Sequence, residues 1–350
     1  MFKTLMQCLA VVVVVVGGSG MASAQTRVQG GGASFPAPLY AKWTAEYNKA
    51  NPEVKVDYQP SGSGGGIKGI TDRVLHFAGS DAPLTADQEK KVPAPVLHIP
   101  TVAGPVVMIY NLPGLSGELK LNGEAVAGIF LGEIKTWDHA KIKTLNPTLN
   151  LPSKPIVVVH RSDGSGTSFI FTSYLSKVSK TWKDKVGAAT SVDWPVGLGG
   201  KSNAGVAQNV QNTQGSIGYV ESAFAVSNRL PYAAQINKAG KEVKASIEGV
   251  EAAAASLKEI PADLKVDITD AEGEAAYPIA GYTYMLVYQD VSYLKNKALA
   301  ENVLKYVNWC ITDGQSMAKD LGYAKLPAEM GAKVSAKLKT VTFDGQALLK

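Results

Sequence analysis

The sequence predicts an α/β protein with two domains. Twice, an apolar strand is followed by a turn of small residues and then by an amphipathic helix. Two further apolar segments, residues 101–110 and 277–288, lie far apart in the chain, and both have the extended pattern of strands. A chain of 350 residues is also longer than one hydrophobic core usually serves, because a domain has about 100–200 residues.

The first 24 residues have the pattern of a secretory signal peptide. Lys3 is followed by an apolar run over residues 8–16 and by the small residues Ala22-Ser23-Ala24, which predicts cleavage after Ala24. The run is shorter than the roughly 18 residues that span a bilayer. We therefore expect an exported, soluble protein that begins at Gln25. Cys310 is then the only cysteine, so no disulfide is expected, and its helical surroundings favour a core position.

Charge and motif spacing exclude several classes of function. The formal net charge is +5, but basic and acidic residues are interspersed, so nucleic acid is not an expected partner. The four histidines have none of the spacings typical of metal sites, and we expect neither a metal nor a cofactor.

In the first part of the chain, small residues repeatedly precede helices. A helix is predicted over 36–47 with Tyr40, Trp43 and Tyr47 on one buried face, directly after the segment 30–35 that contains Ser34 and Phe35. The strand 54–58 leads to Ser61-Gly62-Ser63-Gly64 and to a helix that carries Ile67, Ile70 and Val74. A short strand over 75–78 ends in Gly79-Ser80-Asp81, and Thr85 with Gln88 fits a capping box.

The stretch Arg161-Ser162-Asp163-Gly164-Ser165-Gly166-Thr167 is the strongest candidate site. It lies between a strand over 156–159 and a helix whose apolar face includes Phe171, Tyr174, Leu175 and Val178. The N-terminus of a helix has unpaired N–H groups and a partial positive charge, so it can hold an anion. Arg161 adds a planar fork suited to an oxyanion, and Asp163 is placed to orient it.

The extended segments 101–110 and 277–288 are candidates for two crossings between domains. The resulting division gives one domain from residues 25–104 and 283–350, with residues 105–282 inserted as the other. Residues 245–260 are alanine-rich and predict a helix, whereas the polar, basic residues 325–350 predict a surface ending.

Three catalytic or nucleotide-binding motifs fit poorly. Gly64 to Gly69 matches a dinucleotide fingerprint without a well-placed acidic residue, and the P-loop-like end at Gly200-Lys201-Ser202 has Pro195 in its first glycine position. A nucleophile elbow at Ser165 would need glycines where Asp163 and Thr167 stand. Because His160 adjoins this loop, an exported serine hydrolase or phosphatase remains an alternative.

Five segments in order resemble the periplasmic phosphate-binding protein of bacterial phosphate ABC transporters. The likeness extends from about Gly30 to Pro327. The matching segments are Gly31–Pro38, Gly79–Leu84, Arg161–Ser168, Gly197–Lys201 and Gly215–Glu221.

The resemblance implies a two-domain periplasmic-binding-protein fold of type II-like topology, with phosphate bound in the cleft between hinged domains. It implies a monomeric, periplasmic receptor that is not an enzyme and delivers phosphate to a membrane ABC permease. Carried over by position, the residues expected to bind phosphate are Ser34, Phe35, Ser63, Asp81, Arg161, Ser165, Gly166 and Thr167. Asp163 falls on the residue that pairs with the binding arginine, and Ser61 is an alternative to Ser63.

A receptor for sulfate or molybdate is the nearest alternative within the same class. A fully ionised dianion has no proton to donate, so a carboxylate in the site, such as Asp81, would repel it. Phosphate keeps at least one proton near neutral pH and can donate it to that carboxylate. Asp81 therefore favours phosphate over the other two anions.

Overall fold

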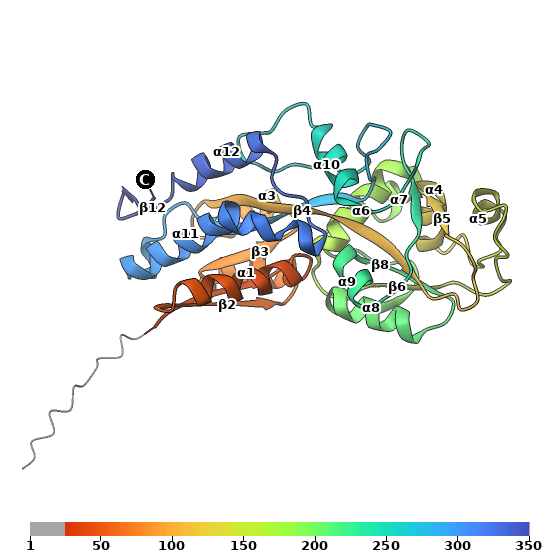
Figure 1. The fold of residues 1–350 in the computed structure, drawn as a ribbon, viewed down its shortest axis with the longest axis horizontal. Helices are drawn as coiled ribbons and strands as arrows, with labels where there is room; N and C mark the ends of the chain where they lie inside the picture. The colour runs from red at the N-terminus through yellow and green to blue at the C-terminus, as the bar shows by residue number, and fades with distance from the viewer. Residues whose placement is uncertain (1–24, 350) are drawn as a thin grey trace, which may run out of the picture.

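The computed structural model describes residues 25–349, which form two lobes joined side by side along the long axis of the molecule (Figure 1). The predicted signal peptide, residues 1–24, lies outside the described residues. Within them, no helix is both long and apolar enough to cross a membrane. The fold class predicted from the sequence, α/β with two domains, is confirmed.

The first lobe combines the two ends of the chain. Its elements are β1 (Thr26–Gly32), α1 (Ala37–Ala50), β2 (Val54–Pro60), α2 (Ser63–Thr71), β3 (Phe77–Ser80), α3 (Ala86–Glu89), β11 (Ala280–Tyr288), η1 (Ser292–Leu294), α11 (Lys297–Ile311), η2 (Asp313–Met317), η3 (Lys319–Leu321), α12 (Ala328–Leu338), β12 (Thr342–Phe343) and β13 (Gln346–Ala347). Figure 1 shows α1, α11 and α12 together in this lobe, although they come from opposite ends of the chain.

The second lobe is built from the middle of the chain. Its elements are β5 (Lys120–Asn122), α4 (Gly123–Phe130), α5 (Ala140–Leu145), β6 (Val157–Arg161), α6 (Gly166–Val178), α7 (Lys180–Lys185), β7 (Leu198–Gly200), α8 (Ser202–Asn212), β8 (Ser216–Glu221), α9 (Ser222–Ser227), β9 (Ala234–Ile236) and β10 (Glu242–Val243). The helix α10 (Ile247–Ala255) packs on β4 (Val96–Tyr110) and β11, where the chain returns to the first lobe.

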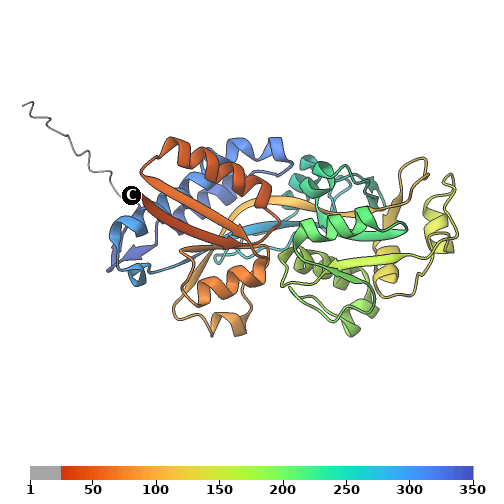
Figure 2. The same ribbon diagram turned by 90° about the horizontal axis from the view of Figure 1, so that it is seen from below.

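A single ladder of eight strands runs through both lobes, in the order β2-β1-β3-β11-β4-β8-β6-β7. The long strand β4 connects the halves, because it pairs with β11 as far as Pro105 and with β8 from Val106 onward. Proline has no N–H to donate to a ladder, and here it stands where the pairing changes partner. Figure 2 shows β4 and β11 passing from one lobe to the other.

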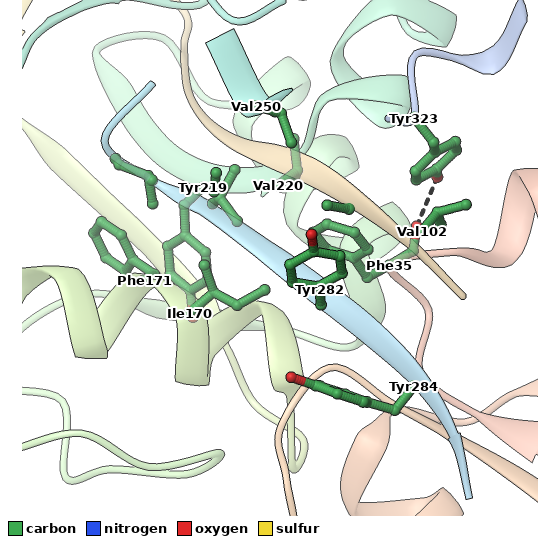
Figure 3. Close-up of a cluster of buried hydrophobic side chains, with 14 of the residues drawn as sticks. Phe35, Val102, Ile170, Phe171, Tyr219, Val220, Val250, Tyr282, Tyr284 and Tyr323 are labelled. Atoms are coloured by element: carbon green, nitrogen blue, oxygen red, sulfur yellow. Dashed lines mark hydrogen bonds between the residues drawn. The ribbon is translucent and has the colours of Figure 1, made fainter. Parts of the chain in front are cut away.

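Buried aromatic and aliphatic side chains fill the junction of the lobes. Figure 3 shows Phe35 and Tyr323 on one side of β11 and Phe171 with Tyr219 on the other, with Tyr282 between them. Phe171 stacks on Tyr219 with ring centroids 4.4 Å apart, and both rings are fully buried. The predicted core positions Tyr40, Trp43 and Tyr47 of α1 are also buried.

Some local predictions differ from the structure. The strand β1, which contains three of the glycines before α1, was not predicted, because glycine-rich sequence has low strand propensity. The helix α2 ends at Thr71, so Val74 lies outside it and is 63% exposed.

The prediction of a surface ending after residue 325 is wrong. That segment forms α12, whose residues Met330, Val334 and Leu338 are buried against the first lobe. These residues recur every four positions, which is the helical spacing of a buried stripe. Lys325, Lys333, Lys337 and Lys339 of this segment are not buried with them.

Candidate anion-binding site

Three turns that precede or begin helices meet at the junction of the lobes. The turn before α1 holds Ser34 and Phe35, the start of α2 holds Ser63, and the start of α6 holds Ser165, Gly166 and Thr167. The first two belong to the first lobe and the third to the second lobe. All six residues are buried, so this is an interior arrangement of polar groups.

The N-terminus of α6 follows directly from local sequence. The strand β6 ends at Arg161, and Ser165 caps α6 by accepting a hydrogen bond of 3.0 Å from the N–H of Ser168. The N–H of Thr167, in the first turn, has no protein acceptor within residues 25–349, and the same holds for the N–H of Phe35. Such unpaired N–H groups in the interior are the donors that an anion needs.

Arg161 is held in place by Asp163 through two parallel hydrogen bonds. Its Nε lies 2.8 Å from Oδ1 and its Nη2 lies 2.6 Å from Oδ2 of the carboxylate. Burial raises the pKa of Asp163, but the hydrogen bonds and charge of Arg161 outweigh it, so the pKa is lowered overall. Asp163 is therefore ionised near neutral pH, and the Nη1 of Arg161 points to the hydroxyl of Thr167, 3.4 Å away.

Ser63 and Asp81 connect the first lobe to α6. The N–H of Gly166 donates to Ser63 Oγ at 3.0 Å, and the N–H of Asp81 donates to the same oxygen at 3.1 Å. Ser63 is fully buried, whereas Ser61 is exposed, so the arrangement brings Ser63 and not Ser61 to the other residues.

Asp81 is a buried carboxyl group beside a single arginine. Its Oδ1 accepts a hydrogen bond of 2.8 Å from Thr283. Burial raises the pKa of Asp81 to about 7, although the Thr283 hydroxyl and the charge of Arg161 act in the opposite direction. The group is therefore poised to exchange a proton near neutral pH.

Close backbone approach requires glycine at two positions between the lobes. A Cβ on Gly62, whose φ is +88°, would lie 2.3 Å from the Oδ2 of Asp163. A Cβ on Gly166 would lie 2.5 Å from the Cβ of Asp81 and 2.5 Å from the Oγ of Ser63. No real Cβ tolerates such distances, so these glycines let the two lobes meet at the site.

The structure also brings in residues that the sequence did not assign to the site. Asn203, in the first turn of α8, donates to Ser34 and to Thr167, and Thr283 on β11 contacts Asp81. Tyr219 donates or accepts at Ser168 and accepts from the N–H of Arg161. Asn203 and Thr283 lie in no motif that the sequence singled out, whereas Tyr219 belongs to the segment Gly215–Glu221 that resembles the family. Tertiary packing brings all three to the site.

The arrangement offers no base to Ser165. The Nδ1 of His160 lies 3.0 Å from the backbone oxygen of Arg161, and its ring stacks on Trp194 with centroids 4.8 Å apart. The hydroxyl of Ser165 instead caps α6. A nucleophilic serine needs a base within hydrogen-bond reach, which His160 does not provide here.

Comparison with known proteins shows the family to which the chain belongs. Residues 19–313 match the family model described as a PBP superfamily domain. The chain is 43% identical over 329 residues to the phosphate-binding protein PstS of Pasteurella multocida, covering 93% of this chain and 94% of that protein. It is 38% identical to the phosphate-binding protein PstS of Methanocaldococcus jannaschii, covering 85% and 82%.

Solved structures give the same fold at lower identity. A phosphate-binding protein from Stenotrophomonas maltophilia superposes with a TM-score of 0.65 at 22% identity, covering 89% of this chain and 93% of that one. A high-affinity periplasmic phosphate-binding protein, PfluDING, superposes with a TM-score of 0.71 at 21% identity, covering 89% and 93%. The extent and level of identity to the curated relatives decide the assignment: this chain belongs to the PstS family of phosphate-binding proteins, within the PBP superfamily.

Proposed function

We propose that this protein is an exported receptor that binds inorganic phosphate between its two lobes and delivers it to a membrane ABC permease. The observation that carries the proposal is a set of buried polar residues, linked by hydrogen bonds at the junction of the lobes, that comprises Ser34, Ser63, Thr167 and Arg161. A buried anion must have its charge met by hydrogen bonds, and three helix starts with an arginine supply them. The curated relatives are named phosphate-binding proteins.

The residues proposed to bind phosphate are those expected from the sequence. They are Ser34, Phe35, Ser63, Asp81, Arg161, Ser165, Gly166 and Thr167. Arg161 is fixed by Asp163 and carries the one full positive charge, while the other residues except Asp81 offer hydroxyl or N–H groups. Asp81 is the one acceptor, and it suits an anion that carries a proton.

The proposed domains are residues 25–104 with 283–350, and residues 105–282. The change of partner along β4 between Pro105 and Val106 supports this division, as does the start of β11 at Ala280. Because every proposed ligand residue comes from one chain and both domains contribute, we propose that a monomer closes on phosphate. Export through the signal peptide of residues 1–24 would place it in the periplasm.

A panel of anions tests the function. Metal-free protein is unfolded thermally with phosphate, sulfate or molybdate, and Arg161→Ala is run beside the wild type. A ligand at a hundredfold excess over its dissociation constant stabilises a protein by about 2.7 kcal/mol, so phosphate should raise the unfolding temperature. Arg161→Ala should weaken phosphate binding by roughly tenfold or more, because a hydrogen bond to a charged group is worth about 1.5–3 kcal/mol.

Stabilisation by sulfate or molybdate in place of phosphate would identify another oxyanion receptor. Hydrolysis of a phosphate ester that is lost in Ser165→Ala would identify the hydrolase alternative. Unchanged phosphate affinity in Arg161→Ala would show that the loop is not the site.

A further inference from the structure

Three hydroxyl groups of the site, those of Ser34, Ser63 and Thr167, each accept hydrogen bonds from two N–H groups. A hydroxyl oxygen has one proton to donate and two lone pairs to accept with. When N–H groups occupy both lone pairs, the hydroxyl can act only as a donor. The hydroxyl proton then needs a separate acceptor, and an anion is well suited to accept it.

Asn203 imposes this condition on two hydroxyls that come from different lobes. Its backbone N–H lies 3.2 Å and its Nδ2 lies 3.0 Å from the Oγ of Ser34, so both lone pairs of that oxygen are used. The other proton of Nδ2 goes to the Oγ1 of Thr167 at 3.0 Å. That oxygen also faces the Nη1 of Arg161 at 3.4 Å, which uses its second lone pair.

The orientation of the Asn203 amide is fixed by a third contact. Its Oδ1 accepts a hydrogen bond of 3.0 Å from the N–H of Glu221, a group that can only donate. The oxygen therefore faces β8, and the NH₂ group must face Ser34 and Thr167. Asn203 is fully buried, so no solvent competes for these bonds.

We propose that Asn203 is a positioning residue that turns Ser34 and Thr167 into obligatory donors toward phosphate. The inference rests on the proposed function and deepens it, because it explains why two hydroxyls, which in general can accept as readily as donate, would prefer an anion. Asn203 itself donates both protons of Nδ2 to the two hydroxyls, so it affects phosphate binding only through them. It also ties a first-lobe residue, Ser34, to a second-lobe helix.

Ser63 provides an internal comparison that does not depend on Asn203. Its Oγ accepts from the N–H groups of Gly166 and Asp81, so backbone donors saturate it in the same way. Its proton faces the Oδ2 of Asp81 at 3.4 Å. The site thus fixes the direction of a hydroxyl proton twice through one asparagine and once through the backbone.

The test uses two substitutions at Asn203 in the full mature chain. Asn203→Ala removes the amide, and Asn203→Asp keeps the acceptor for the N–H of Glu221 but replaces the NH₂ group with an oxygen. The hydroxyls of Ser34 and Thr167 would then donate their hydrogen bonds to the new carboxylate, so these protons would no longer be available to phosphate. Phosphate affinity, measured by calorimetry, should fall by roughly tenfold to a hundredfold in Asn203→Ala and further in Asn203→Asp.

Asn209→Ala is the matched control. Asn209 lies on the same helix, is not buried, and donates only to the backbone oxygen of Gly199. Its replacement should leave phosphate affinity within about twofold of wild type, because surface substitutions usually change free energies by about 0.5 kcal/mol or less.

Double-mutant cycles separate the positioning role from a purely structural one. If Asn203 acts through the hydroxyls, Asn203→Ala should cost several-fold less affinity in a Ser34→Ala or a Thr167→Val background than in wild type. The same reduction is expected for Asn203→Asp, whereas simple charge repulsion between the introduced carboxylate and phosphate would persist in these backgrounds. Thermal unfolding without phosphate reports whether each variant is folded.

Additive effects in both cycles, or wild-type affinity in Asn203→Asp, would overturn the inference. If Asn203→Ala fails to fold, the isosteric Asn203→Asp carries the same test. Failure of the wild type to bind phosphate in the same titration would instead reject the proposed function, so the two failures are distinguishable.

Discussion

At the scale of single residues, the environment of Asp81 differs from that of every other group in the site. The neighbouring groups donate, and Asp81 is a carboxyl group whose pKa burial raises to about 7. It is held by the hydroxyl of Thr283 and by its own N–H to Ser63. In its ionised form it accepts a hydrogen bond from an anion that carries a proton, and it repels an anion that does not.

We expect Asp81→Asn to lose discrimination against sulfate. Contact between two desolvated like charges costs several kcal/mol, so sulfate should compete with labelled phosphate at roughly a hundredfold lower concentration in the variant. In wild type, sulfate should also compete better as the pH falls through about 7, because protonated Asp81 no longer repels it. The variant should lack this pH dependence.

Competition curves at pH 8 and pH 6 on both proteins provide the measurement. Asp72→Asn, which changes an exposed carboxylate paired with Lys68, is the control and should behave as wild type. Equal competition by sulfate in Asp81→Asn and wild type would show that Asp81 stabilises its turn but does not discriminate between the two anions.

At the scale of secondary-structure elements, the site depends on how closely the start of α6 approaches α2 and the end of β3. Gly166 is the first residue of α6, and its N–H reaches Ser63 across the junction of the lobes. The sequence predicted this strand, turn and helix correctly, because the β-branched run and the apolar stripe are both local patterns. These local patterns did not reveal which residues of the other lobe would face the turn; only the resemblance to a known family suggested them.

Gly166→Ala should weaken phosphate binding by roughly tenfold or more with little loss of unfolding temperature in the absence of phosphate. Its Cβ would stand 2.5 Å from Asp81 and Ser63, so the lobes could not approach fully, which lowers the population of the binding-competent state. Alanine does not weaken a helix relative to glycine, so α6 itself should remain intact. Calorimetry and thermal unfolding measure the two quantities.

Gly331→Ala in α12 is the matched control, because a Cβ there would meet nothing within 4 Å. It should leave phosphate affinity unchanged. Unfolding of the whole protein by Gly166→Ala at ordinary temperature would contradict the expectation, since it would mean that the two lobes cannot separate.

At the scale of the whole molecule, a buried carboxyl group links the two lobes beside the site. The hydroxyl of Tyr323 lies 2.8 Å from the backbone oxygen of Phe35, and 2.9 Å from the Oε2 of Glu221 (Figure 3 shows the contact with Phe35). The hydroxyl of Tyr323 has one proton for these two oxygen acceptors. A protonated Glu221 satisfies both contacts, because it can donate to the Tyr323 oxygen. Burial raises the pKa of Glu221 to about 8, which agrees with a protonated group.

Stability should therefore fall as the pH rises from the ordinary pKa of glutamic acid, 4.5, through about 8. In this window the folded state keeps a proton that the unfolded state has lost, so each rise in pH favours unfolding. One pKa unit corresponds to about 1.4 kcal/mol, and the whole decline should amount to a few kcal/mol. Glu221→Gln keeps a donor toward Tyr323 and cannot ionise, so this variant should not show the decline in stability with pH.

Denaturant unfolding at pH 7, 8 and 9 isolates this group, because the contribution of Asp81 is lost mostly below pH 7. Glu248→Gln, at a position near the start of α10, is the control. A wild-type decline between pH 7 and 9 that persists in Glu221→Gln would assign it to another group.

The sequence by itself determined the fold class, the strand and turn before α6, the capping box at Thr85 and the set of small polar residues at helix starts. These features depend on residues within a few positions of one another, so hydrophobic periodicity and capping residues are enough to predict them. The tertiary structure decided that Ser63, and not Ser61, faces the other lobe, that Asn203 and Thr283 join the site, and that α12 packs on the first lobe. Each depends on contacts between residues far apart in the chain. The apolar stripe of α12 is a local pattern, but it does not say which lobe the stripe packs against.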